Sequence, residues 1–236
     1  MSVELFHADN SDFFDVLSLR CCAADAVRGS SLISCAEQGD RSAAIALKVG
    51  FWPFVREFEF AIDQQHLSRQ VLVAGFGEPR VRRVFTGIAR AVREMKQEEG
   101  SHSAHWMRDA QCLGVSDFGG PCVAGVQALI DRAHMKDLAG FFGTLAGTEL
   151  IAEELSRYLV ESRRFTDLFS RRRWMWGEVH LLADDGPSHL DIDLDLARAY
   201  GPTASGVEIG QGVLDTIALF ARAADDVVAA LLPELV

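Results

Sequence analysis

Apolar residues recur at spacings of three and four positions through most of the 236-residue chain, and this periodicity constrains its fold more than any other feature. The pattern is typical of amphipathic helices that bury one face. Strand-like alternation is confined to one short run, 190–196, which can equally be a loop entering a helix. Only six prolines interrupt the chain. We therefore predict an all-α protein.

The pattern divides into about seven helices that form one domain spanning residues 1–236, an up-and-down helical bundle. The predicted helices cover 11–27, 40–72 with a break at Trp52-Pro53, 79–97 with a bent continuation to 113, 121–134, 135–162, 165–183 and 206–232. No internal repeat or low-complexity linker suggests a second domain. A bundle of this kind can build a metal site from side chains that face its interior.

Charge and cysteine content exclude several classes of function. The formal net charge of −11 argues against a nucleic-acid partner, because phosphate binding depends on clustered Lys and Arg. Five irregularly spaced cysteines predict neither a disulfide framework nor a structural zinc site. The first ten residues do not resemble a signal peptide, and no uncharged apolar run is long enough to span a membrane. We expect a cytoplasmic protein without a membrane partner.

One candidate metal-binding segment lies near the middle of the chain. The apolar face that includes Ile88 continues through Glu99 and His102, which places a carboxylate and an imidazole one turn apart on a buried face. Glu-x-x-His on one helix is the spacing used in di-iron carboxylate bundles. Glu98 and His105 form a second pair on a neighbouring face. A hydrogen-bonded core histidine with solvated glutamates would give the same pattern.

Two later segments add ligands of the same type. Glu149 interrupts an apolar stripe in the segment 138–159, where a buried carboxylate needs a metal or an arginine partner. His180 and Asp184 have the i,i+4 spacing that lets both point at one ion, and His189 follows shortly after. A solvated aspartate near a helix end is the alternative for Asp184. Together, carboxylates and imidazoles without thiolate suit iron or manganese better than structural zinc.

These segments resemble those of the haem-oxygenase-like di-metal oxidases, a superfamily that shares its helical fold with the TenA thiaminases and the pyrroloquinoline-quinone synthesis protein. The similar stretches are 102–114, 147–154 and 179–184. The resemblance covers most of the chain from about Phe51 and implies a haem-oxygenase-like, or TenA-like, fold. Carried over position by position, it implies that the ligands are Glu99, His102, Glu149, His180 and Asp184.

The sequence departs from the family pattern at the last ligand, where Pro187 replaces the expected histidine. His189 could take that role if Gly186-Pro187 forms a bulge. The resemblance implies two Fe(II) ions, dioxygen as co-substrate, and a homodimer. The implied activity is an oxidase or oxygenase of bacterial secondary metabolism. It would act on a small amine or amino-acid-derived substrate by N-oxidation or oxidative C–C cleavage.

Two other functions are compatible with the same residues. A metal-free, TenA-like hydrolase would use a cysteine nucleophile, for which Cys112 is the nearest candidate because it falls within the His102 segment. A non-catalytic helical binding protein would leave the acidic stretch 180–195 as a solvated loop. Metal uptake, thiol alkylation and a pocket between the helices distinguish the three.

Overall fold

A computed structural model describes residues 16–61, 69–120, 122–135, 137–169, 174–181, 190–194 and 206–233. Within the helices, the side chains of residues 71, 83–92, 94–96, 98, 99, 138, 139, 206 and 207 are excluded from this description. The described residues are mostly helical and include no strand, so the all-α prediction is confirmed.

The helices follow one another with short connections. Their bounds are α1 Val16–Gly29, α2 Ser31–Glu37, α3 Arg41–Gly50, α4 Trp52–Ala61, α5 Arg69–Phe76, α6 Glu78–Cys112, α7 Ala124–Ala133, α8 Leu138–Val160, α9 Arg163–Thr166, the 3-10 turn η2 Asp167–Phe169, α10 Met175–Val179 and α12 Gly206–Leu231. Residues 190–194 are also helical, so the described part of the alternating run is not a strand.

Most of the predicted helices are confirmed, with two exceptions. The break beside Trp52-Pro53 occurs at Phe51, between α3 and α4, and α6 is continuous from Glu78 to Cys112. The prediction of one helix over 165–183 is wrong, because α9, η2 and α10 divide its described part. The prediction also missed α2, whose seven residues are too short to show a clear period.

Side-chain caps explain where several helices begin. Ser30 caps α2, Asp40 caps α3 and Ser162 caps α9, each accepting a hydrogen bond from a backbone N–H of the first turn. Asp137 caps α8 in the same way, through Gly140 N at 2.9 Å. These caps satisfy amide groups that the helices themselves leave without partners.

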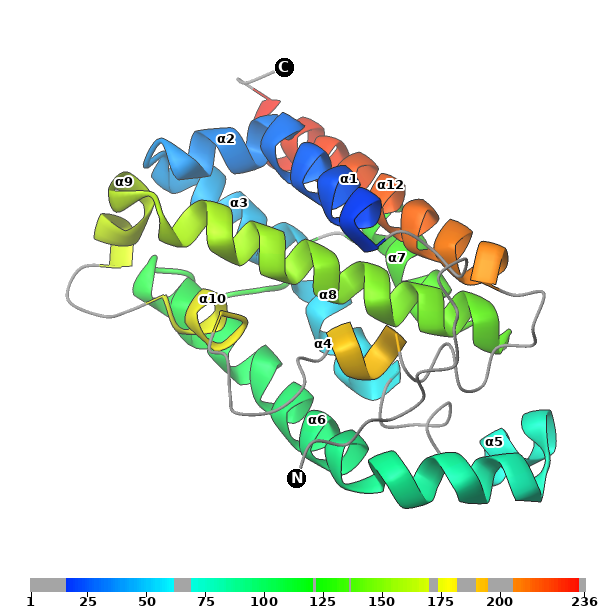
Figure 1. Ribbon diagram of the computed structural model, residues 1–236. Helices are drawn as coiled ribbons and strands as arrows, with labels where there is room; N and C mark the ends of the chain where they lie inside the picture. Colours follow the sequence, from blue (N-terminus) through cyan, green and yellow to red (C-terminus); the bar gives the residue numbers. More distant parts are fainter. Residues whose placement is uncertain are drawn as a thin grey trace.

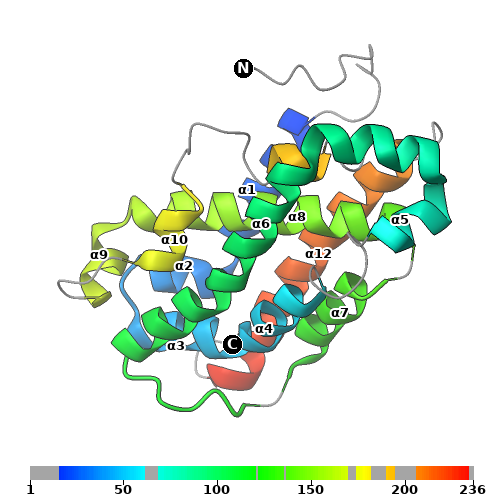
Figure 2. The ribbon, with the colours of Figure 1, turned by 90° about the horizontal axis from the view of Figure 1, so that it is seen from below.

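Helix α8 is the central element of the bundle (Figure 1). It packs against α1 and α12 on one side and contacts α10 on another, while the long α6 crosses the molecule and carries α5 at its far end (Figures 1 and 2). Glycines allow the close contact between α8 and α12. A Cβ on Gly143 would lie 2.9 Å from Gly212 Cα, and one on Gly147 would lie 2.8 Å from Thr216 Cβ.

None of the described helices combines the length and the apolar character required to cross a lipid bilayer.

Candidate functional site

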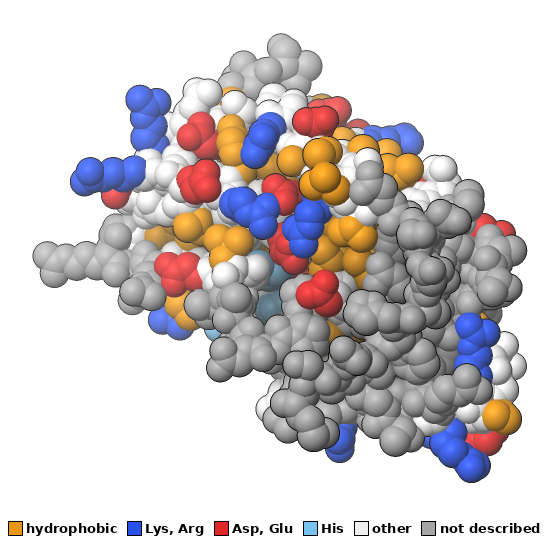
Figure 3. Space-filling view, viewed as in Figure 1, with side chains coloured by type: hydrophobic (Ala, Val, Ile, Leu, Met, Phe, Trp, Pro, Cys, Tyr) orange, Lys and Arg blue, Asp and Glu red, His pale blue; other side chains and the backbone are white. Residues whose placement is uncertain are grey.

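A cavity of about 50 Å³ lies among α4, α6, α8 and α10. Four of its lining side chains are ionisable, and each comes from a different helical segment. They are Glu59 of α4, His102 of α6, Glu149 of α8 and His180, which follows the last residue of α10. We call this the polar chamber. On the face shown in Figure 3, histidine side chains are visible at the bottom of a recess between acidic and basic side chains.

The two histidine rings of the polar chamber are in contact. The ring centroids of His102 and His180 are 4.5 Å apart, and the centroid of the Trp176 ring lies 4.1 Å from that of His180. His180 Nδ1 is 2.7 Å from the backbone oxygen of Trp176, which can only accept a hydrogen bond. Nδ1 therefore carries the proton, and in the neutral ring Nε2 carries the lone pair that a metal ion would use.

The two carboxylates of the chamber come from different helices. Glu149 is only 5% exposed and lies on α8 next to Thr148, another lining residue. Glu59 is half-buried on α4, and its Oε2 accepts a hydrogen bond of 2.5 Å from Ser103 Oγ on α6. A carboxylate offers about four acceptor sites, so one bond from Ser103 leaves Glu59 able to bind a cation or a donor.

A buried ion pair holds α10 in place. Asp109 of α6 accepts hydrogen bonds from the backbone N–H groups of Met175 at 3.2 Å and Trp176 at 3.0 Å, and so caps α10 from another helix. Lys48 Nζ of α3 lies 3.4 Å from Asp109 Oδ2, and both side chains are 1% exposed. Trp176 lies in the capped first turn of α10, and His180 follows the end of this short helix. Asp109 therefore fixes the position of one wall of the polar chamber.

Aromatic rings complete the surroundings of Lys48. Its Nζ lies 3.8 Å from the centroid of the Trp106 ring and 5.5 Å from those of Trp174 and Trp176. Burial lowers the pKa of Lys48 from 10.5 to about 8, and the charge and hydrogen bond of Asp109 offset part of that shift. No local sequence pattern indicates this cluster, because its residues come from three separate helical segments.

The structure describes part of the predicted site. His102, Glu149 and His180 line one cavity, whereas His105 lines neither this cavity nor the apolar one described below. Glu99 lies in α6 with its side chain outside the described part, and Asp184 and His189 lie outside the described residues. Among the described side chains, no group of three or more His, Cys, Asp or Glu is already arranged around a common metal position.

Sequence reasoning missed Glu59. Its helix shows an apolar stripe through Phe54 and Phe58, and a glutamate beside such a stripe resembles an ordinary solvated residue. The available signal was the four-residue spacing from Val55, which also lines the polar chamber. That spacing places Glu59 on the cavity side of α4 only when the position of α6 is known.

The donor set of the polar chamber fits a cation that prefers nitrogen and oxygen. Two imidazoles and two carboxylates suit iron or manganese, and they include no thiolate. None of the described cysteines, Cys112 included, lines either cavity.

Comparison with known proteins shows the fold. A crystal structure of a TenA homologue from Pseudomonas syringae pv. tomato superposes with a TM-score of 0.67 and 15% sequence identity, over 97% of this chain and 96% of that one. No family model matches the chain, and no curated protein matches it. The likeness therefore shows a TenA-like, all-α fold.

Proposed function

We propose that this protein is an iron- and dioxygen-dependent oxidase or oxygenase that acts on a small amine or amino-acid-derived substrate. One observation carries the proposal: His102, Glu149 and His180, three residues of the expected ligand set, line a single cavity although they lie on separate helical segments. Glu99 and Asp184 would add ligands to this centre, and His189 could complete it.

Each described residue has a defined part in such a centre. His102 and His180 would donate imidazole nitrogens, and the bond from His180 Nδ1 to Trp176 O leaves Nε2 as the donor atom. Glu149 would neutralise the cation, because its carboxylate lines the cavity and is 5% exposed. Iron, when bound, supplies the capacity to activate dioxygen.

The surroundings of the cavity support oxidative chemistry in other ways. Phe54, Phe58 and Trp176 line the polar chamber with rings that exclude water from a reactive site. Glu59 of α4 also lines the chamber, where it could hold a substrate ammonium group or accept its proton. In this proposal Glu59 orients the amine, while Glu149 and the two histidines serve the metal.

Anaerobic loading of the purified metal-free protein with Fe(II) tests the proposal. We expect iron to bind with defined stoichiometry, measured by elemental analysis after desalting, and dioxygen to be consumed when an amine substrate is added. Glu149→Gln and His102→Gln should each lose most of the bound iron, because each removes a ligand from the cavity.

Matched controls separate this result from general damage. Glu161→Gln changes an exposed glutamate at the C-terminal end of α8, and His105→Gln changes the histidine that lines neither cavity. Both should retain iron. A protein that takes up no iron, or whose iron content is the same in Glu149→Gln as in the wild type, would contradict the proposal.

The hydrolase alternative predicts a different outcome. A cysteine-dependent activity would be abolished by thiol alkylation, whereas the proposed oxidase should retain its activity because no described cysteine lines either cavity.

A further inference from the structure

A second cavity of about 60 Å³ adjoins the polar chamber. The two share the side chains of Phe54, Val55, Thr148, Ala152 and Trp176, so they lie side by side with a common wall. A group the size of a water molecule or a methylene needs about 10–15 Å³ of such a cavity. The second cavity therefore has room for about four to six methylene groups. We call it the apolar chamber.

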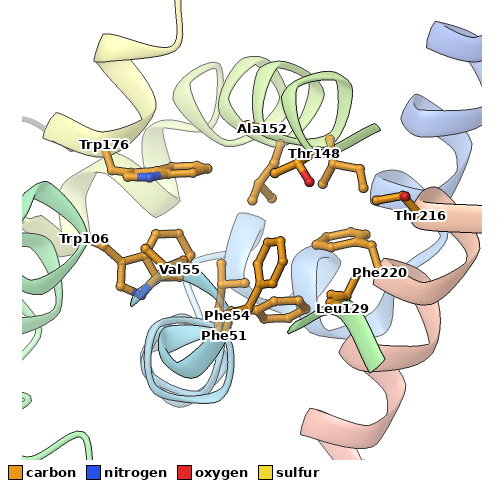
Figure 4. A pocket seen from close by; sticks show the side chains of 13 residues that line it. Phe51, Phe54, Val55, Trp106, Leu129, Thr148, Ala152, Trp176, Thr216 and Phe220 are labelled. Atoms are coloured by element: carbon orange, nitrogen blue, oxygen red, sulfur yellow. The ribbon is translucent and has the colours of Figure 1, made fainter. Parts of the chain in front are cut away.

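The apolar chamber extends away from the histidines, toward α7 and α12. Figure 4 shows Leu129 and Phe220 at the end far from Trp106 and Trp176, with Phe51 and Phe54 of the α3–α4 region below. Among the side chains that the structure describes, none that lines this chamber is titratable. Such a space favours an apolar group over water, because water would have few hydrogen-bonding partners there.

Thr148 marks the junction between the chambers. Its hydroxyl oxygen is buried and has no hydrogen-bond partner among the described residues, and it lies on the cavity side of α8 in Figure 4. Thr144 and Thr216 instead donate to the backbone oxygens four residues before them, at 2.8 Å each. A buried hydroxyl without a partner is costly, which indicates that Thr148 bonds to a ligand in the pocket.

We infer that the substrate is a primary amine with an unbranched or aromatic apolar tail of about six carbons, its ammonium group in the polar chamber and its tail in the apolar chamber. This inference rests on the proposed function and adds the substrate class. Glu59 provides the negative charge that recognises the ammonium group. Thr148 Oγ1 accepts a hydrogen bond from the ammonium group at the junction, where the polar head meets the tail.

Calorimetric titration of the full-length, metal-free protein with hexylamine, butylamine and ethylamine tests the tail. Each buried methylene should tighten binding by about fourfold, so hexylamine should bind on the order of 10²-fold more tightly than ethylamine. The three probes carry the same charge, so non-specific attraction to an acidic protein cancels. Hexanoate has a tail of similar length and the opposite charge, and it should bind more weakly than hexylamine.

Two variants locate the binding. Leu129→Phe should shorten the apolar chamber and reduce the preference for hexylamine over butylamine, while ethylamine binding stays unchanged. Thr148→Val keeps the side-chain shape and should weaken hexylamine binding about threefold to tenfold through the lost hydrogen bond. Thermal unfolding checks that each variant is folded, and Thr148→Val remains informative if Leu129→Phe is not.

The outcomes separate this inference from the proposed function. Equal affinity for all three amines, or equal affinity for hexanoate and hexylamine, would overturn the substrate assignment even in a protein that binds iron. Chain-length-dependent amine binding in a protein that takes up no iron would leave the pocket assignment standing and refute the oxidase.

Discussion

Replacing Asp109 with alanine should destabilise the protein severely, because this carboxylate serves three partners at once. It lies 3.4 Å from the Lys48 ammonium and accepts the backbone N–H groups of Met175 and Trp176. With both charged side chains 1% exposed, water cannot replace what is lost.

The expected magnitude follows from these contacts. Removing one partner of a buried ion pair costs about 3–5 kcal/mol, because the remaining charge stays buried. The two uncapped amides of α10 raise the cost for Asp109→Ala toward the upper end of that range. Asp109→Asn retains an oxygen that can accept a bond from an amide and should cost less. Since total stabilities are about 5–15 kcal/mol, the variants should still be measurable.

A double substitution separates charge from packing. Lys48→Met combined with Asp109→Asn leaves no buried charge, and methionine retains most of the apolar length of lysine. We expect the double variant to recover at least half of the stability lost in Lys48→Met, because the two residues are in direct contact and their effects are not additive.

Urea denaturation followed by tryptophan fluorescence and by far-ultraviolet circular dichroism provides the measurement. Three of the four tryptophans lie around Lys48, so fluorescence reports on this cluster directly. Coincident transitions would justify a two-state free energy. A loss in the free energy of unfolding below about 1 kcal/mol in Asp109→Ala would refute the reasoning. So would a double variant whose loss equals or exceeds the sum of the losses in the two single variants.

Three further predictions follow from the same structure. The pKa of Lys48 is about 8 in the folded protein, against 10.5 for an ordinary lysine, so the unfolded chain binds more protons between these pH values. The free energy of unfolding should therefore rise by roughly 3 kcal/mol over this interval in the wild type and not in Lys48→Met. Gly143→Ala should cost about 1–3 kcal/mol because its Cβ would meet the α12 backbone, whereas Gly29→Ala, with nothing within 4 Å, should be neutral or stabilising in the same denaturation assay. Thr144→Val should lose about 1 kcal/mol with its hydrogen bond to Gly140 O, whereas Thr148→Val should not lower the melting temperature; equal losses would contradict the assignment of Thr148 to a ligand.

The sequence predicted the helical class well because helices leave a local record. The apolar period of α6 and the proline two residues after Phe51 are both local features of the sequence, and the helix and the break follow from them. The division of 165–183 was not predictable in this way. It depends on Asp109, more than sixty residues earlier, which caps a new helix start at Met175.

The candidate site shows the same division between local and non-local information. Metal-ligand spacing singled out His102 and His180, and an interrupted apolar stripe singled out Glu149. All three line the polar chamber. Glu59 and Thr148 belong to the same pocket but have no spacing that distinguishes them from surface or core residues. Both residues reach the pocket only because helices far apart in the sequence pack together, and no local pattern in a single sequence predicts that packing.

The cap on α10 also provides a way to observe the pocket. The amides of Met175 and Trp176 donate to a side chain of α6, so their hydrogen exchange measures how often α10 separates from α6. A ligand held between Trp176 and α8 would oppose that separation, and its binding energy would appear as slower exchange at these two amides. A bound ligand would thus hold the short α10 against α6. Hydrogen exchange at the first turn of α10 would then report whether the pocket is occupied, without any turnover.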